Sequence, residues 1–400
     1  MDVKCIVEKY KSPFYLYDLK ELKARTDLVR DSLPGISVCY AMKAAPVLAP
    51  YMAEYADRLE VCSPGEYEIC IRNGVSPDRL LVSGVNKTYE SMKRILDLGG
   101  EAGAFTIESE KHFEILEKCA GAADIKLDCY VRLSSGNQFG VDEEVFKSIC
   151  QKVIASPNLS LVGIHFFSGT QKKMSKIQSE LQFLMELGKT LTEELGQGME
   201  LEYGPGLGID YFVDPKGGSS EGADEEALSK LNSIIEETGI REVYGAVTFE
   251  HGRFLAATSG KYFTAVNDLK NTNGANYVIL DGGIHQINYF GSMAGMKVPY
   301  IDVIKMGNDS GAVNDEVAAY TLCGSLCSVN DVLVRSVQLP TLEIGDVLCF
   351  NKCGAYSATE GISLFLSRDI PAILVALETG EVRVVREHME INGLNDGTAK

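Results

Sequence analysis

Between Ser37 and Phe254 the sequence alternates short apolar or β-branched runs with amphipathic helical stretches. The eight runs are SVCYAMKA, RLEVCS, RLLVSG, GAFTIES, KLDCYVRL, LVGIHFFSG, ELEYGPG and AVTFEHGRF. Helical patterns occupy Pro64–Asn73, Thr88–Leu98, Glu110–Ala120, Lys173–Leu195 and Asp224–Thr238. Eight strand–helix units over roughly 220 residues predict an α/β fold, a (β/α)8 TIM-type barrel. A doubly wound sheet normally carries a glycine-rich turn after its first strand, and this sequence has none there.

A different pattern follows Lys261. Runs such as NGANYVILDGG, LEIGDVLCF and AILVALETGEVRVV alternate with Gly, Asn, Asp and Pro, which predicts a C-terminal antiparallel β domain. We therefore expect residues 10–262 to form the barrel and residues 263–400 the β domain, with residues 1–9 packed on the β domain. The segment Pro215–Glu225, rich in Gly, Ser and Glu, predicts an exposed loop within the barrel.

The charge excludes several classes of partner. The 38 Lys and Arg residues against 56 Asp and Glu residues leave a net charge of −18, which repels nucleic acid and anionic membrane surfaces.

No run approaches the ~20 apolar residues of a membrane span, and the N-terminus lacks the features of a signal peptide, so we expect a cytoplasmic protein. Its 11 cysteines are then expected to be thiols. The absence of a metal-binding motif predicts no metal site.

Lys43 is a candidate catalytic residue because it follows the first strand of the predicted barrel. Active sites in such barrels form at the carboxyl ends of the strands. The apolar flanks in YAMKAAP would partly desolvate the amine and lower its pKa, as Schiff-base chemistry requires. Alternatively, Lys43 is a strand-end lysine whose amine reaches into water.

Glycine-bearing turns follow the last two strands of the predicted barrel. One is EYGPGLG, and the other contains Glu250, Gly252 and Arg253. Barrels often bind phosphate esters with the backbone N–H groups of these loops, although GPGLG by itself is more often a tight turn. The combination favours pyridoxal phosphate, with the glycines on its phosphate, Glu250 on its pyridine nitrogen and Lys43 on its aldehyde.

The motifs SPFYLYD, YAMKA, EVCSPGEYE, GIHFFSGTQ, EYGPGLG, FEHGR, LCSVND and GAY follow one another along the chain. With this series the sequence resembles, over nearly its whole length, the fold type III pyridoxal-phosphate decarboxylases, the family of diaminopimelate and ornithine decarboxylases. The resemblance implies an alanine racemase-like barrel with a β domain, in a homodimer with shared active sites. It also implies the roles of single residues: Lys43 carries the cofactor, and Glu250 pairs with the pyridine nitrogen. The phosphate is bound by Gly204, Gly206, Gly252 and Tyr356, and the site is supported by Arg253 and Glu66. Cys327 and Asp331 are implied to reach the site of the partner subunit.

The chemistry of decarboxylation explains these residue types. Loss of CO2 leaves an electron pair at Cα that the protonated pyridine ring absorbs, so Glu250 must be anionic. A proton must then return to Cα, and the Cys327 thiol is the predicted donor. Alternatively, Cys327 is a structural thiol, as expected for most of the other cysteines. Tyr356 has a similar alternative as a core tyrosine with a satisfied hydroxyl.

Three positions depart from the usual pattern of this family. The histidine that stacks on the cofactor aligns with Phe167, whereas His165 lies two residues earlier on the same side of the strand, so either ring is a candidate. Ser328 replaces an acidic residue that usually pairs with the distal ammonium of a diamino substrate. Tyr289 replaces an arginine expected to hold the distal carboxylate of diaminopimelate. His285, in the same segment, is either a substrate residue or a turn histidine.

The sequence therefore predicts a pyridoxal-phosphate-dependent decarboxylase of an amino acid or amino-acid derivative without a free distal charge, either free or tethered to a carrier protein. The alternatives are a decarboxylase of diaminopimelate or another diamino acid, and an amino-acid racemase on the same fold. A non-catalytic homologue is a further alternative, against which Lys43, Glu250 and Cys327 all argue.

Overall fold

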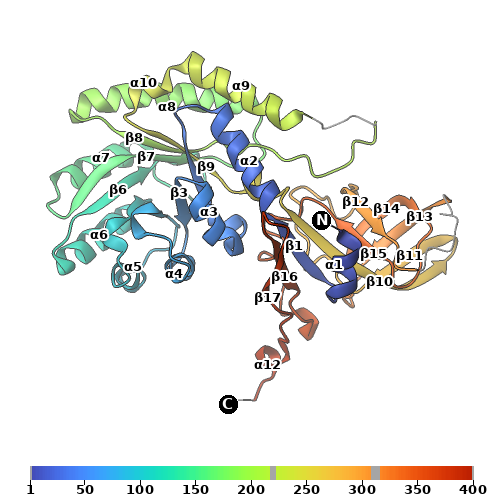
Figure 1. Cartoon of the computed structure of the whole chain (residues 1–400). Helices are drawn as coiled ribbons and strands as arrows, with labels where there is room; N and C mark the ends of the chain where they lie inside the picture. Colours follow the sequence, from blue (N-terminus) through green and yellow to red (C-terminus); the bar gives the residue numbers. More distant parts are fainter. Residues whose placement is uncertain (1, 217–221, 308–315, 399–400) are drawn as a thin grey trace. The chain divides into compact units, whose positions relative to one another are not determined.

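The computed structural model describes residues 2–216, 222–307 and 316–398. Its chain divides into two compact units (Figure 1). The barrel unit comprises Lys23–Ile209 and Glu221–Leu255, and the β unit comprises Met1–Leu22, Asp210–Ser220 and Ala256–Lys400.

Eight parallel strands close into a barrel in the barrel unit, and each overlaps one of the runs identified in the sequence. They are β2 (Ser37–Ala41), β3 (Arg58–Val61), β4 (Leu80–Val82), β5 (Ala104–Ile107), β6 (Leu127–Arg132), β7 (Leu159–Phe167), β8 (Glu200–Gly204) and β9 (Val247–His251). Pairing of β2 with β9 closes the ring. The predicted (β/α)8 barrel is confirmed.

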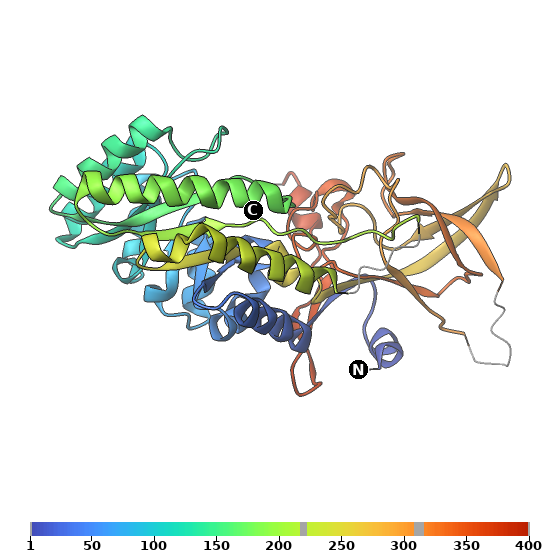
Figure 2. The same cartoon turned by 90° about the horizontal axis from the view of Figure 1, so that it is seen from above.

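Helices α3 to α10 connect successive strands of the barrel, whereas α2 precedes β2 and α11 follows β9. They are α2 (Leu19–Ser32), α3 (Ala49–Tyr55), α4 (Pro64–Arg72), α5 (Tyr89–Leu96), α6 (Glu110–Ala123), α7 (Glu143–Ala155), α8 (Met174–Leu195), α9 (Ala223–Thr238), α10 (Ile240–Val243) and α11 (Arg253–Ala256). Side chains of Ser63, Thr88 and Ser109 cap the N-termini of α4, α5 and α6, which fixes where these helices begin. Figure 2 shows α8 and α9 side by side on the outside of the barrel.

The β unit is built on a nine-stranded sheet. Its strands are β1 (Phe14–Asp18), β10 (Gly260–Thr272), β11 (Ala275–Leu280), β12 (Ile301–Ile304), β13 (Val317–Cys323), β14 (Val332–Pro340), β15 (Val347–Phe350), β16 (Ala372–Ala376) and β17 (Val382–Arg386), with the short helices α1 (Val3–Lys9) and α12 (Asn392–Asn395). Most pairs are antiparallel, as predicted, but β1 with β16 and β11 with β13 are parallel.

The boundary at residue 10 differs from the sequence prediction, which assigned residues 10–22 to the barrel. Strand β1 instead pairs on one edge with β10 and on the other with β16. Phe14 and Leu16 share a core cluster with Ile6, Val7 and Phe263. Hydrogen bonding on both edges therefore holds β1 in the β unit. Residues 217–221, in the predicted exposed loop, lie outside the described part of the chain.

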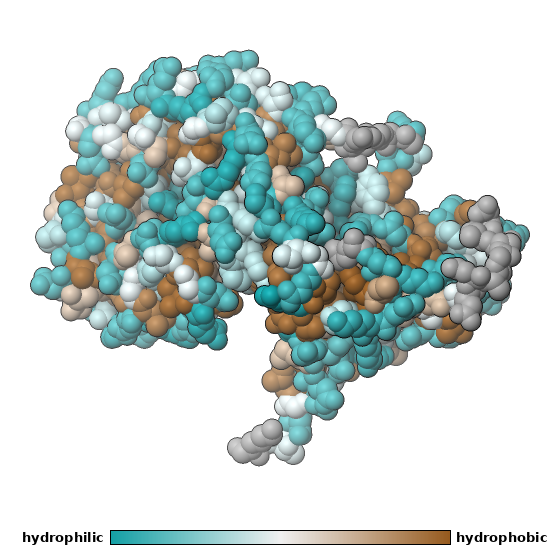
Figure 3. Space-filling model, viewed as in Figure 1, coloured by the Kyte–Doolittle hydropathy of each residue, from teal (hydrophilic) through white to brown (hydrophobic). Residues whose placement is uncertain are grey.

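No helix within the described ranges combines the length and apolar character needed to cross a bilayer. In the view of Figure 3, hydrophilic residues cover much of both units.

Candidate active site

Lys43 lies in the short 3-10 helix Met42–Ala44, immediately after the carboxyl end of β2. Its Nζ donates a hydrogen bond of 2.8 Å to Glu60 Oε2 and lies 3.6 Å from Cys62 Sγ. Glu60 is buried on β3 and also accepts a hydrogen bond of 2.5 Å from Ser83 Oγ. These contacts hold the amine against the neighbouring strand at the carboxyl end of the barrel.

The electrostatics of Lys43 correct the prediction of a lowered pKa. Burial alone does lower the pKa of this amine, but the Glu60 carboxylate opposes burial and the net pKa lies well above its usual value. The prediction was wrong because it considered the apolar flanks and not the partner on the next strand. Glu60 is thus a site residue that the sequence analysis missed, and its signal was an acid within the apolar run RLEVCS.

Glu250 on β9 and His165 on β7 lie together inside the barrel. Glu250 Oε1 and His165 Nε2 are 3.2 Å apart, and the two side chains are 7% and 1% exposed. The contact does not have hydrogen-bond geometry, so neither atom has a hydrogen-bond partner among the described residues. A buried carboxylate oxygen is costly to leave without a donor. Glu250 therefore fits the N–H of a protonated pyridine ring. The aromatic ring beside Glu250 is that of His165.

The turn after β8 has the properties of an anion site. A Cβ on Gly204 would lie 2.3 Å from the Phe167 ring, and one on Gly206 would lie 2.1 Å from Gly169 O. Gly206 also has a φ of +61°, which a side chain disfavours. The N–H groups of Gly206 and Leu207 make no hydrogen bond to any described residue. Free N–H groups in a tight glycine turn suit a phosphate.

Other predicted barrel residues lie around these groups. Gly252 follows β9, and a Cβ there would lie 3.3 Å from both Ala41 and Ala44. Arg253 begins α11 directly after Gly252. Glu66, in the first turn of α4, accepts a hydrogen bond of 2.6 Å from the backbone N–H of Cys62. The structure therefore links Glu66 to Lys43 through the loop after β3.

Comparison with known proteins identifies the family. The model of the pyridoxal-dependent decarboxylases, pyridoxal binding domain, matches residues 19–257. The chain belongs to the pyridoxal-dependent decarboxylases. The L-glutamyl-[BtrI acyl-carrier protein] decarboxylase of Niallia circulans is 25% identical, over 96% of this chain and 93% of the relative. The diaminopimelate decarboxylase of Aquifex aeolicus is 24% identical, over 97% of this chain and 91% of the relative.

A solved structure has the same fold. The crystal structure of diaminopimelate decarboxylase from Helicobacter pylori, complexed with L-lysine, superposes with a TM-score of 0.82 at 23% identity and covers 98% of each chain. The predicted family, fold, pyridoxal phosphate cofactor and decarboxylase activity are confirmed for this pyridoxal-dependent decarboxylase. Its own residues fit the cofactor, because Lys43, the free Glu250 oxygen and the free N–H groups of the glycine turn belong to one barrel.

In the β unit, the turn Ser325–Asn330 carries Cys327 and Ser328, which are both exposed. Asp331 is buried beneath the turn: its carboxylate accepts hydrogen bonds from Leu326 N at 2.7 Å and Ile284 N at 2.8 Å. Asp331 therefore holds the backbone of the Cys327 turn instead of presenting a free charge.

The remaining predicted residues of the β unit have different surroundings. Tyr356 has a φ of +69°, a rare conformation for a residue with a side chain and one that often occurs at functional sites. Tyr289 is buried, with its hydroxyl 2.5 Å from Asn351 O and its ring against Tyr211. His285 is also buried, neither of its ring nitrogens has a hydrogen-bond partner in the described chain, and burial lowers its pKa. The packing of Tyr289 gives it a structural role and argues against substrate contact.

Glu202 is a further buried acid that the sequence analysis did not single out. It is fully buried on β8, accepts a hydrogen bond of 3.0 Å from Arg58 Nη1, and lies with Cys39 close to Glu250. Burial raises the pKa of Glu202 to about 8, and the Arg58 guanidinium opposes this effect. Arg58 therefore places a positive charge beside the group Cys39, Glu202 and Glu250, which disfavours a divalent cation there.

We expect Glu202→Gln to change how stability depends on pH. A carboxyl whose pKa is about 8 when folded and near 4.5 when unfolded contributes full stability below the lower value and loses it as the pH rises through the higher one. Glutamine resembles the protonated form, so the wild type should lose on the order of 1–3 kcal/mol relative to the variant between about pH 5 and about pH 8. Urea unfolding across this range measures the difference. The exposed Glu193→Gln serves as control, and a pH-independent difference for Glu202→Gln would contradict the assignment.

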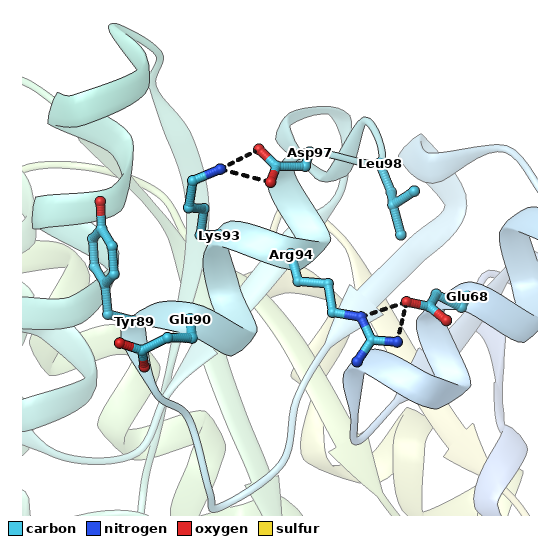
Figure 4. Close-up of a pocket in the computed structure, with 7 residues that line it drawn as sticks. All are labelled: Glu68, Tyr89, Glu90, Lys93, Arg94, Asp97 and Leu98. Carbon is cyan, nitrogen blue, oxygen red and sulfur yellow. Dashed lines mark hydrogen bonds and ion pairs between the residues drawn. The ribbon is translucent and has the colours of Figure 1, made fainter.

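A hollow between α4 and α5 is not a candidate site (Figure 4). Both of its basic side chains are paired with acids: Lys93 with Asp97 at 2.6 Å, and Arg94 with Glu68 at 2.5 Å. Exposed pairs of this kind are common on helix surfaces and indicate no ligand.

Proposed function

We propose that this decarboxylase acts on an α-amino acid, or a carrier-tethered amino-acid derivative, whose distal end carries no free ammonium group. The turn around Cys327 carries this proposal. Ser328 is neutral, and both oxygens of the nearby Asp331 are occupied by backbone N–H groups. A desolvated ammonium group would find no carboxylate partner on this turn, which would cost on the order of 1–3 kcal/mol or more.

The relatives support two kinds of substrate. One acts on an L-glutamyl group on an acyl-carrier protein, and another on diaminopimelate. The free ammonium of a diamino acid does not suit Ser328, whereas an acyl-linked substrate has no such charge to satisfy. We therefore favour the carrier-tethered or acylated substrate over the diamino acid.

The following roles belong to the proposal. Pyridoxal phosphate, when bound, supplies a sink for the electron pair that departing CO2 leaves at Cα. Lys43 holds the cofactor aldehyde, and Glu60 orients Lys43 Nζ through their hydrogen bond. Glu250 pairs with the pyridine nitrogen, His165 packs on the ring, and the N–H groups around Gly204, Gly206 and Gly252 hold the phosphate with Tyr356. Cys327 returns the proton to Cα.

The proposal includes a homodimer. Exposed apolar side chains lie on the segments that adjoin the Cys327 turn: Ile284, Val329, Ile362, Leu364, Phe365 and Leu366. Val329 is 93% exposed, and Arg368 Nη2 ties the last segment to Ser325 O at 2.8 Å. Neighbouring exposed apolar residues are typical of a protein interface. We propose that a second copy covers them and that Cys327 enters the partner's active site.

A CO2-release screen tests the substrate. Free amino acids and L-amino acids loaded on an acyl-carrier protein are compared at equal concentration, and the α position is followed for racemisation. We expect an acylated or carrier-bound amino acid to react at least about tenfold faster than ornithine, lysine or diaminopimelate. Preference for a diamino acid would overturn the proposal, and α-proton exchange without CO2 release would favour the racemase.

A substitution at Ser328 tests the argument from charge. We expect Ser328→Glu to raise kcat/KM for diaminopimelate by about tenfold, because the new carboxylate can pair with the distal ammonium group. Ser328→Ala, which adds no charge, should change this value little. Steady-state CO2 release gives both numbers. Equal activity of the two variants on diaminopimelate would show that this position does not select the distal group.

A further inference from the structure

The segment between β7 and α8 is hydrogen-bonded to the glycine turn that follows β8. Gln171 reaches Ile209 twice: its Nε2 donates to Ile209 O at 3.0 Å, and its Oε1 accepts from Ile209 N at 2.5 Å. The backbone N–H of Lys172 donates to Gly206 O at 2.9 Å. Gln171 has a φ of +55°, a strained conformation that the surrounding contacts must maintain. The turn that bears the free N–H groups is thus clamped from the preceding loop.

The side chain of Lys172 is buried beneath the same turn. Its Nζ donates to Gly204 O at 2.8 Å and to Glu180 Oε2 at 2.7 Å. The Lys172 and Glu180 side chains are only 6% and 4% exposed. Burial lowers the pKa of Lys172, and Glu180 opposes this effect. The ammonium group also donates to Ser168 Oγ at 3.3 Å and to Tyr203 Oη at 3.4 Å, so it has a full set of partners and is held firmly against the turn.

Two lysines contact the Glu180 carboxylate. Besides Lys172, the exposed Lys176 Nζ lies 3.5 Å from Glu180 Oε1. The remaining donors to Glu180 are the neutral hydroxyls of Ser168 and Tyr203. Of the two lysines, only Lys172 also donates to the glycine turn, so the structural link between Glu180 and the turn passes through Lys172.

The geometry of the peptide bond links Lys172 to the open side of the turn. In a trans peptide the C=O of one residue and the N–H of the next point in opposite directions. Lys172 binds Gly206 O through its backbone N–H, so the N–H of Leu207 points away from Lys172. At Gly204 O the next residue is Pro205, which has no N–H, and the turn depends on the donors of Gly206 and Leu207.

We propose that Lys172 is a positioning residue for the cofactor phosphate. It holds the carbonyl groups of Gly204 and Gly206 on one side of the turn, so that the N–H of Leu207 points to the other side and remains free for the phosphate. The inference rests on the proposed role of this turn as the phosphate site. It concerns the phosphate alone and predicts no effect on the aldehyde or the pyridine ring.

A comparison of two ligands tests the inference. Pyridoxal has the same ring and aldehyde as pyridoxal phosphate but lacks the phosphate, so the ratio of the two affinities for cofactor-free protein reports on the phosphate site. In Lys172→Met combined with Glu180→Gln, which leaves no unpaired buried charge, we expect the affinity for pyridoxal phosphate to fall about tenfold or more and that for pyridoxal to change less than about threefold. Absorbance titrations measure both.

Matched variants separate the outcomes. Lys176→Met removes the other lysine that contacts Glu180, which does not touch the turn. This variant should retain at least half of the wild-type ratio of the affinities for pyridoxal phosphate and pyridoxal. Lys172→Arg should retain more of this ratio than Lys172→Met. Equal losses for both ligands in the double variant, or no loss for pyridoxal phosphate, would overturn the role of Lys172. A wild type that binds both ligands equally would instead refute the phosphate turn in the proposed function.

Discussion

Lys43→Ala is expected to reduce decarboxylation by about a thousandfold or more, because the amine that holds the cofactor aldehyde is removed. Borohydride treatment of the wild-type holoenzyme should attach the cofactor irreversibly to Lys43, and peptide mass spectrometry should find it on this residue. CO2 release measures the loss of activity. The exposed Lys111→Ala should retain full activity and labelling.

Lys87 makes this experiment decisive, because it is a second lysine buried in the barrel unit. Burial lowers the pKa of Lys87 to about 8, so by basicity alone it is the better nucleophile at neutral pH. Its Nζ, however, is committed to Gly84 O at 2.7 Å and Thr106 Oγ1 at 3.2 Å. The Lys43 side chain is 40% exposed, and its contact with the Glu60 carboxylate holds the amine at the carboxyl end of the barrel. Labelling of Lys87 instead of Lys43 would overturn the site.

The barrel was predictable because its signal is local. Each strand is a short apolar run between helices, and the eight strands fall on the eight runs. The position of β1 was not predictable in this way. FYLYD looks like one more strand of the barrel, and its partners β10 and β16 lie about 250 and about 360 residues further along the chain. Local pattern does not indicate which of two sheets a strand joins.

The site was predictable where a motif carries the chemistry and not where the chemistry comes from a contact. Lys43 and Glu250 follow from their places at strand ends. Glu60 acts only because β3 lies beside β2, and its carboxylate reverses the effect of the apolar flanks on the pKa of Lys43. Lys172 and Glu180 likewise meet the glycine turn only through the packing of β7 against β8. Partners on neighbouring strands are the part that sequence spacing leaves out.

Cys327→Ala is expected to slow turnover by about a hundredfold to ten-thousandfold, the usual effect of losing a general acid, without loss of the bound cofactor. Cys327 and Cys5 are the two exposed cysteines in the described chain, so Cys5→Ala is the matched control and should be fully active. Absorbance of the bound cofactor and CO2 release are measured on the same samples. Undiminished turnover in Cys327→Ala would remove its role as proton donor.

Mixing the two inactive variants tests whether the site is shared. Lys43→Ala subunits retain Cys327, and Cys327→Ala subunits retain Lys43. If Cys327 acts in the partner's site, each mixed dimer contains one complete site and one doubly impaired site. Because half of the dimers are mixed after subunit exchange of equal amounts, we expect recovery of about a quarter of wild-type activity. If both residues acted in the same subunit, no mixed dimer would hold a complete site and activity would not return. Mixing at a protein concentration that favours monomers should likewise fail to restore activity, since the complete site would then require an assembly that is absent.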